Sequence, residues 1–169
     1  MNGARAIPAP LRIMLLAGLG IAAVQSAMIP LSPGSGLVPP DLLYCLVVAW
    51  AVRDPATVAL WLVAALGLFA DTMLGRPLGL GALGLVLVAE VARGVGAQRR
   101  GPPFLLEWLA AVAGFALMLA ASHVVLRLSL VEPPGLAASA RHLVATALAY
   151  PIIAMVVARG VGLRAAPGA

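Results

Sequence analysis

Apolar residues along this chain gather in six long runs, which short segments rich in proline, glycine or charge separate. Each run is continuously apolar rather than alternating, so the pattern favours helices over the strands of a membrane barrel. A helix needs about 20 mostly apolar residues to cross a bilayer. The runs therefore predict six membrane-spanning helices, at residues 11–31, 37–52, 56–74, 77–92, 104–126 and 142–158.

The segments between the runs have the composition of turns. Prolines and glycines recur in residues 30–36, and the prolines at 39–40 suit the first turn of a helix, where no backbone N–H is needed. A polar tip at 53–55 separates the second and third runs, and proline-rich segments at 101–103 and 132–135 separate the last three. We therefore expect short connections and almost no soluble part.

Composition agrees with a membrane protein rather than a soluble one. Of the 169 residues, 63% are hydrophobic and only 10% are charged, whereas soluble domains are about 45–50% apolar and about 25% charged. A water-soluble core of this size cannot hide so much apolar surface. The sequence therefore predicts an all-α integral membrane protein, a six-transmembrane-helix bundle formed by one membrane domain over residues 1–169.

Arginine counts predict the orientation, since segments on the cytoplasmic side of a membrane carry an excess of basic residues. All eleven basic residues are arginines. With both termini inside, the inner segments carry Arg5, Arg12, Arg53, Arg93, Arg99, Arg100, Arg159 and Arg164. The outer segments carry Arg76, Arg127 and Arg141. This bias favours cytoplasmic termini, and arginines spread over the ends of the apolar runs argue against nucleic-acid binding.

The first run also fits a cleavable signal peptide. Arg5 and Arg12 would form its charged region, and residues 24–27 offer small side chains for cleavage. Against this interpretation, the apolar run continues beyond that point. The mass of the intact protein decides between the two, because a chain cleaved there would keep only five of the six spans.

Side chains that carry enzyme chemistry are scarce. The sequence has no phosphate-binding loop, no nucleophile triad and no persuasively spaced carboxylate pair. His123, His142 and Glu132 would be the ligands of a metal site, but their spacing matches no compact ligand motif. The single cysteine, Cys45, lies in an apolar run and has no disulfide partner. We therefore expect no catalytic, cofactor-binding or metal-binding residues.

Three acidic residues have local structural interpretations. Glu90 precedes Arg93 by three residues, so the two can pair on one helix face. Glu107 lies in the first turn of the fifth predicted helix, where the helix dipole favours an anion, and arginines at 99–100 are close by. Asp41 follows two prolines and fits the start of a helix.

Asp71 has no such local explanation, because it lies between two apolar runs, where a carboxylate is costly in hydrocarbon. Gly67, Asp71, Gly75 and Gly79 recur every four residues, and if the helix continues to Gly75 the first three share one face. Small residues at that spacing let another helix approach closely. Three roles stay open for Asp71: a proton or substrate site, a partner contact, or a structural carboxylate that accepts backbone hydrogen bonds or pairs with Arg76.

Two blocks of the chain, taken in order, resemble one family. The first, residues 40–55, opens with Pro40, Asp41 and two leucines. The second block fills every fixed position of the pattern Gly-Leu-x-x-Asp-x-x-x-Gly-x-Pro-Leu-Gly-x-x-Ala-Leu, with Gly67, Leu68, Asp71, Gly75, Pro77, Leu78, Gly79, Ala82 and Leu83. Together the blocks resemble the rod shape-determining protein MreD family, whose length and six-helix layout are also similar. Gly81 departs from the family pattern, which often has a polar residue such as Asn or His there.

The resemblance implies a non-enzymatic scaffold in the bacterial inner membrane. Members of the family bind the bitopic protein MreC and work with the MreB filament, the RodA glycosyltransferase and the elongation-specific transpeptidase in building the lateral peptidoglycan wall. The family is also distantly similar to the substrate-binding membrane subunits of energy-coupling-factor transporters. We expect the hairpin at 71–80 to shape the partner surface, with Asp71 and Arg76 fixing the turn and Gly75 and Gly79 allowing it.

The same distant similarity supplies a rival function, a small-solute-binding membrane subunit of a transporter. Six helices and a polar pocket near Asp71 would suit that function. Only 5% of the residues are aromatic, whereas pockets for such solutes usually combine aromatic and polar side chains. We therefore favour the scaffold, with MreC and membrane lipid as its contacts and without a cofactor.

Overall fold

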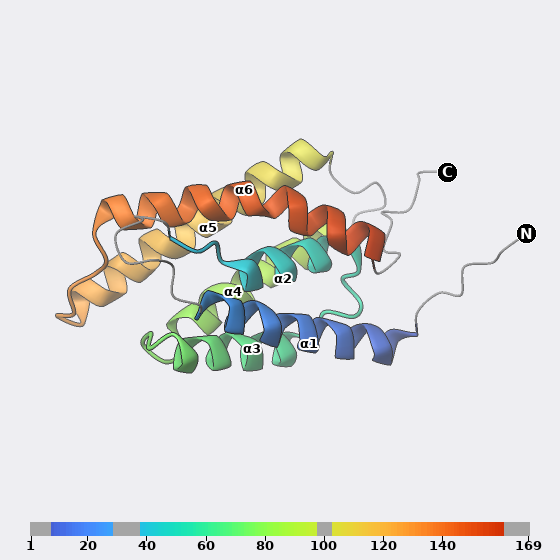
Figure 1. The fold of residues 1–169 in the computed structure, drawn as a ribbon, viewed down its shortest axis with the longest axis horizontal. Coiled ribbons are helices and arrows are strands. Elements are labelled where there is room, and N and C mark those ends of the chain that lie inside the picture. Colours follow the sequence, from blue (N-terminus) through green and yellow to red (C-terminus); the bar gives the residue numbers. More distant parts are fainter. Residues whose placement is uncertain (1–7, 29–37, 98–102, 161–169) are drawn as a thin grey trace, which may run out of the picture.

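The computed structural model describes residues 8–28, 38–97 and 103–160, and within these ranges every regular element is a helix. The helices are α1 (Ala9–Ala27), α2 (Leu42–Arg53), α3 (Leu60–Met73), α4 (Leu80–Gly96), α5 (Phe104–Leu128) and α6 (Leu136–Gly160). They run up and down the molecule, so α1 begins and α6 ends at the same end, which we call the terminal end (Figure 1). The opposite end, with the α3–α4 turn, we call the hairpin end. The all-helical prediction is confirmed for the described residues.

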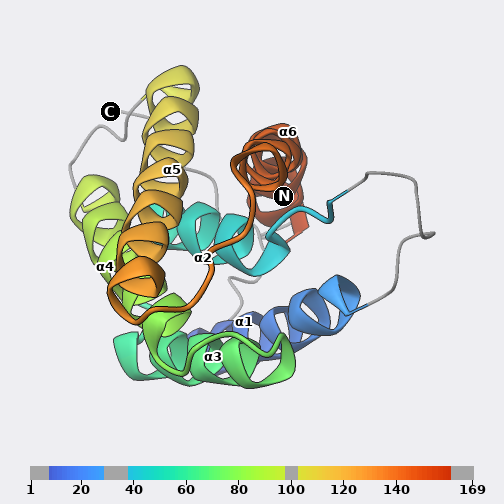
Figure 2. The ribbon, with the colours of Figure 1, turned by 90° about the vertical axis from the view of Figure 1, so that its left-hand side faces the viewer.

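Helix α2 lies at the centre of the bundle. Its residues 43–51 are all buried, and it contacts α1, α4, α5 and α6. Viewed along the bundle, α2 lies between α6 on one side and α4 with α5 on the other, above α1 and α3 (Figure 2). A helix that is apolar all round needs cover on every face, and here other helices supply that cover.

Helix length separates the bundle into two groups. Three helices, α1, α5 and α6, are long and apolar enough to cross a membrane, so the structure has the character of a helical membrane protein. Helix α2 has 12 residues and α3 has 14. At 1.5 Å per residue they measure about 18 and 21 Å, against about 30 Å for a hydrocarbon core. Crossing by all six helices therefore stays a prediction.

The observed boundaries differ from the predicted ones most in the last helix. Helix α6 begins at Leu136 rather than at 142, so Arg141 and His142 lie in its second turn instead of at its start. The Gly135 carbonyl accepts the first backbone N–H bonds of this helix, which lets it start directly after the prolines. The predicted end of the first span at 31 and the predicted start of the second at 37 fall outside the described residues.

Charged residues at the terminal end pair between and within helices. Arg12 Nη1 of α1 is 2.9 Å from Asp54 Oδ2, directly after α2. Arg93 Nη1 is 2.9 Å from Glu90 Oε2, so the pair expected from their spacing is confirmed. Arg93 Nε also donates to the Pro55 carbonyl at 3.1 Å. These contacts tie the start of α1 and the end of α4 to the connection between α2 and α3.

Glu107 is the centre of a buried cluster at the same end. Its Oε1 accepts hydrogen bonds from Arg53 Nη1 of α2 and from the Tyr150 hydroxyl of α6, each at 2.7 Å. Arg53 also donates to the Ala49 carbonyl at 2.8 Å. Glu107 lies in the first turn of α5, as predicted. Its observed partner is Arg53, and the arginines at 99–100 lie outside the described residues.

Candidate functional site

Two glycines build the α3–α4 turn in a backbone conformation that other residues rarely adopt. Gly75 has a φ of 62° and Gly79 a φ of 88°. The N–H of Arg76 donates to the Asp71 carbonyl at 2.9 Å, a bond that closes a helix end around a left-handed residue. Helix α3 ends at Met73, one residue before the predicted end at 74, so the condition under which Gly67, Asp71 and Gly75 would share one helix face is not met.

The Asp71 side chain joins α3 to the start of α4. It is 1% exposed, and its Oδ2 accepts hydrogen bonds from the backbone N–H groups of Gly79 and Ala82 at 3.0 and 3.2 Å. The first N–H groups of a helix lack partners within that helix and carry partial positive charge. A carboxylate supplied by the preceding helix satisfies them. These are the backbone hydrogen bonds expected of a structural carboxylate.

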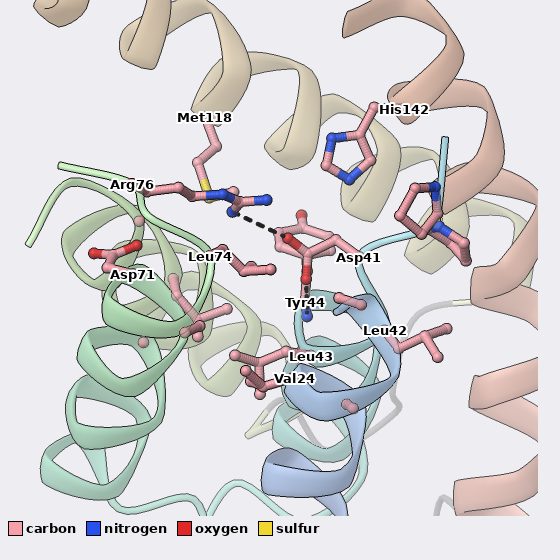
Figure 3. Close-up of a pocket in the computed structure, with 18 of the residues that line it drawn as sticks. Val24, Asp41, Leu42, Leu43, Tyr44, Asp71, Leu74, Arg76, Met118 and His142 are labelled. Carbon is pink, nitrogen blue, oxygen red and sulfur yellow. Dashed lines mark hydrogen bonds and ion pairs between the residues drawn. The ribbon is translucent and has the colours of Figure 1, made fainter. Parts of the chain in front are cut away.

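Arg76 makes a different contact from the one expected. No ion pair joins Asp71 to Arg76, both of which the structure describes; instead, Arg76 Nη1 is 3.7 Å from Asp41 Oδ2. Figure 3 shows Arg76 reaching from the α3–α4 turn toward Asp41 at the start of α2, while the Asp71 carboxylate points to the other side. Arg76 therefore links the turn to α2 rather than closing it onto Asp71.

Small residues let α3 and α4 approach each other closely. A methyl group on Gly67 would lie 2.6 Å from the Cα of Ala82, so the two helices meet backbone to backbone at this point. A methyl group on Gly81 would collide with Oδ1 of Asp71. The Asp71 carboxylate thus occupies the space beside the position where the family resemblance expects a polar side chain. We call this set the hairpin clasp, consisting of Gly67, Asp71, Gly75, Gly79, Gly81 and Ala82.

Asp41 starts α2, as predicted. Its Oδ1 accepts a hydrogen bond from the Tyr44 N–H at 2.9 Å, a helix cap from its own side chain. Its N–H donates to the Thr146 hydroxyl of α6 at 3.0 Å, and the Pro40 carbonyl accepts from the Leu42 N–H at 3.0 Å. The Pro40–Asp41 motif therefore determines where the central helix begins and links it to α6.

A cavity of about 200 Å³ lies between the start of α2, the α3–α4 turn and α6. Asp41, Asp71, Arg76 and His142 supply its charged and ionisable lining (Figure 3). An adjoining cavity of about 230 Å³ shares three of these residues and extends toward His123 of α5. We call the two cavities the polar chamber. Because it presents both signs of charge within apolar walls, the chamber suits a small polar group.

Helix α6 presents a polar stripe to the bundle that sequence reasoning missed. His142, Thr146 and Tyr150 are four residues apart, so they share one helix face. His142 lines the polar chamber, Thr146 binds Asp41 and Tyr150 binds Glu107. The four-residue spacing was the available signal, because all three residues lie within the predicted helix at 142–158.

The histidines do not gather with Glu132 into a metal site. The ring nitrogens of His123 lie 2.9 and 3.1 Å from two backbone carbonyl oxygens. The ring of His142 packs edge-on against Phe115, with 5.2 Å between the ring centroids. Across the described parts of the chain, no three His, Cys, Asp or Glu side chains are placed to hold a metal ion.

Three further residues of the second sequence block are exposed. Pro77 and Leu78 are exposed at the tip of the α3–α4 turn, where Leu78 is 71% exposed. Leu83 is 60% exposed on α4. The block thus divides into residues that shape the hairpin and residues that give it an apolar outer surface.

No family model, curated protein or solved structure matches the chain. Its function is therefore inferred from the sequence blocks and from the geometry of the hairpin clasp and the polar chamber.

Proposed function

We propose that the protein is a non-enzymatic scaffold subunit of the bacterial rod complex, which binds MreC and supports lateral peptidoglycan synthesis and cell shape. The observation that carries this proposal is the hairpin clasp. Its residues engage backbone groups and one another, so the most distinctive block of the sequence determines a shape. A block that determines shape favours recognition of a partner over chemistry on a substrate.

We place the protein in the inner membrane with its terminal end in the cytoplasm, so that both termini are cytoplasmic. The arginine bias of the sequence supports this orientation. The short α2 does not need to match the membrane, since protein covers its faces. The short α3 requires local thinning of the bilayer, which costs little per ångström of mismatch. Six crossings are therefore compatible with the observed helix lengths.

The surface that we assign to MreC is the exposed tip of the α3–α4 turn. Leu78 offers an apolar side chain there and does not line the polar chamber. A turn held in one conformation by the clasp loses less conformational entropy when it binds. Contacts with MreB, RodA and the transpeptidase would then be indirect, through MreC.

Co-purification with MreC from detergent tests the proposal. The wild-type protein should retain MreC, and Leu78→Ser should reduce retention by about tenfold, because burying a leucine is worth about 1.5–3 kcal/mol. Leu128→Ser changes a similarly exposed leucine at the end of α5 and should retain MreC. A correctly inserted protein that never associates with MreC would rule out the scaffold, and equal losses in both variants would move the contact away from the turn.

The polar chamber favours a second candidate, a small-solute-binding membrane subunit of a transporter. Its polar groups come from α2, the α3–α4 turn and α6, and such convergence is typical of solute pockets. Among its lining residues the aromatic carbocycles are Tyr44 and Phe115. Mass spectrometry of the purified protein distinguishes the candidates: one equivalent of a retained molecule other than lipid would favour the transporter subunit.

A further inference from the structure

The polar chamber adjoins an apolar groove between α4 and α5. Leu80, Met118 and Ser122 line both the second cavity of the chamber and this groove, whose volume is about 430 Å³. The groove follows α4 from Leu80 to Val91, about 16 Å of helix at 1.5 Å per residue. That length is close to one leaflet of a bilayer whose hydrocarbon core is about 30 Å thick.

The groove is apolar along its length. Exposed side chains of both helices form its walls, namely Leu83, Leu87, Val91, Leu117 and Val125. Met118 of α5 fills the space beside Gly84 of α4, where a methyl group would lie 2.6 Å from its Cγ. The side chain of Met118 therefore fills the gap between α4 and α5 and forms part of the lining of the groove. An apolar groove of leaflet length suits a hydrocarbon chain.

Opposite charges face the chamber near the Leu80 end of this groove, at the hairpin end of the bundle. Arg76 and Asp41 approach to 3.7 Å, which is longer than a hydrogen bond, so both groups can still bond to a third partner. The planar guanidinium of Arg76 suits a phosphate, and Oδ2 of Asp41 suits an ammonium. Asp71, in contrast, directs its Oδ2 to the backbone of the clasp.

We propose that the polar chamber and the groove together bind one membrane phospholipid whose headgroup carries a phosphate and a primary ammonium. The phosphate lies against Arg76 and the ammonium against Asp41, while one acyl chain follows the α4–α5 groove. The lipid fills the space behind the α3–α4 turn and leaves the exposed tip of the turn available. The site is therefore independent of the proposed contact with MreC.

Free phosphoethanolamine carries the same two charged groups and would fill the chamber alone. The groove favours the lipid, because it continues from the chamber along the helix faces and offers an apolar surface that a soluble headgroup cannot use. Burial of each methylene contributes about 0.8 kcal/mol. A chain in the groove therefore makes the lipid the tighter ligand of the two.

Lipid titration of the full-length protein in detergent tests the proposal. The protein is stripped of lipid and titrated with phosphatidylethanolamine, phosphatidylcholine and phosphatidylglycerol of identical chains, and bound lipid is counted by native mass spectrometry. One equivalent of phosphatidylethanolamine should bind about tenfold more tightly than the other two, which lack a primary ammonium for Asp41. Equal affinity for the three lipids would overturn the proposal without any variant being needed.

Substitutions locate the headgroup. Arg76→Gln should weaken phosphatidylethanolamine binding by about tenfold, since it removes a charge-assisted hydrogen bond. Arg141→Gln is the matched control, because Arg141 is an exposed arginine of α6 that does not line the chamber. Equal binding by the two variants would overturn the headgroup assignment.

A second pair of variants distinguishes lipid from soluble headgroup. Ala121→Phe places a ring in the groove and should weaken lipid binding by about tenfold, because two methylenes of burial are worth that much. Ala113→Phe, on the same helix but outside the groove, should bind lipid normally. If free phosphoethanolamine binds as tightly as the lipid and Ala121→Phe has no effect, the ligand is a soluble molecule and the lipid proposal is wrong.

Loss of lipid on co-purification with MreC would also contradict the lipid proposal, by showing that a partner segment fills the chamber.

Discussion

Asp71 owes its burial to two backbone N–H donors at the positive end of α4. Without such donors, removing a carboxylate from water costs several kcal/mol. Gly81 completes the arrangement, because the missing side chain leaves room for the second carboxylate oxygen. The charge of Asp71 and the absence of a methyl group at Gly81 therefore act together, and both positions should be sensitive to substitution.

Asp71→Asn should lower the free energy of unfolding by about 1–2 kcal/mol, because the amide keeps one accepting oxygen but loses the negative charge that the start of α4 favours. Thermal unfolding in detergent measures the change. Glu132→Gln, in the exposed α5–α6 turn, is the control and should stay within about 0.5 kcal/mol of wild type. MreC retention should fall along with stability. Unchanged complex formation and cell shape would show that the carboxylate is dispensable.

Gly81→Ala should destabilise the protein by about 1–3 kcal/mol, because the new methyl group displaces the Asp71 carboxylate from its backbone donors. Gly94→Ala is a matched control on the same helix, since nothing lies within 4 Å of the methyl position there. Alanine should stabilise that site by up to about 1 kcal/mol through helix propensity. Opposite signs for the two variants in one unfolding assay are the expected result, whereas equal signs would refute the close approach.

At the scale of elements, the sequence predicted the helices well and their ends less well. Continuous apolar runs predicted six helices, because a chain in hydrocarbon must satisfy its own backbone. The end of α3 was predicted to within one residue, but the four-residue spacing alone did not show that Gly75 is a left-handed residue outside the helix. Within the candidate site, the clasp residues were visible as a motif. The pairs Arg76–Asp41 and Arg53–Glu107 were not, because they join positions far apart in the sequence.

Glu107→Gln should lower the free energy of unfolding by about 3–5 kcal/mol, because it leaves the buried charge of Arg53 without its partner. Glu90→Gln breaks an exposed pair at the same end of the bundle and should cost less than about 1 kcal/mol. Denaturant unfolding in detergent compares the two variants. A cost for Glu107→Gln no larger than that of the control would mean that Arg53 is solvated by water or lipid headgroups instead.

At the scale of the whole molecule, the bundle reaches different depths at its hairpin end. The α5–α6 hairpin extends beyond the α3–α4 turn there (Figure 1). The polar chamber therefore opens beside a longer apolar wall formed by α5 and α6. If six helices cross the membrane, the short helices place the chamber below the outer membrane surface. This recessed position suits a ligand that enters from the bilayer.

Thiol labelling tests the proposed topology. In a Cys45→Ser background, Leu130→Cys at the α5–α6 turn should react with a membrane-impermeant thiol reagent in intact cells, because that turn is exposed at the hairpin end. Ala56→Cys, exposed between α2 and α3, should react only after the cells are permeabilised. The reverse pattern would show that the hairpin end faces the cytoplasm and the terminal end faces outward. Labelling of both sites from outside would contradict the odd number of crossings, by α3, α4 and α5, that the six-span topology puts between the two sites.

The enclosure of α2 has a consequence for how the protein is made. Ribosomes synthesise α2 before α4, α5 and α6, yet these later helices cover most of its surface. A 12-residue helix is too short to hold itself across a bilayer. If α2 crosses the membrane, its insertion therefore stays incomplete until its neighbours emerge, and α6 arrives last. A chain interrupted before α6 would leave one side of the central helix uncovered, so we expect such a truncated form to be less stable than the full chain.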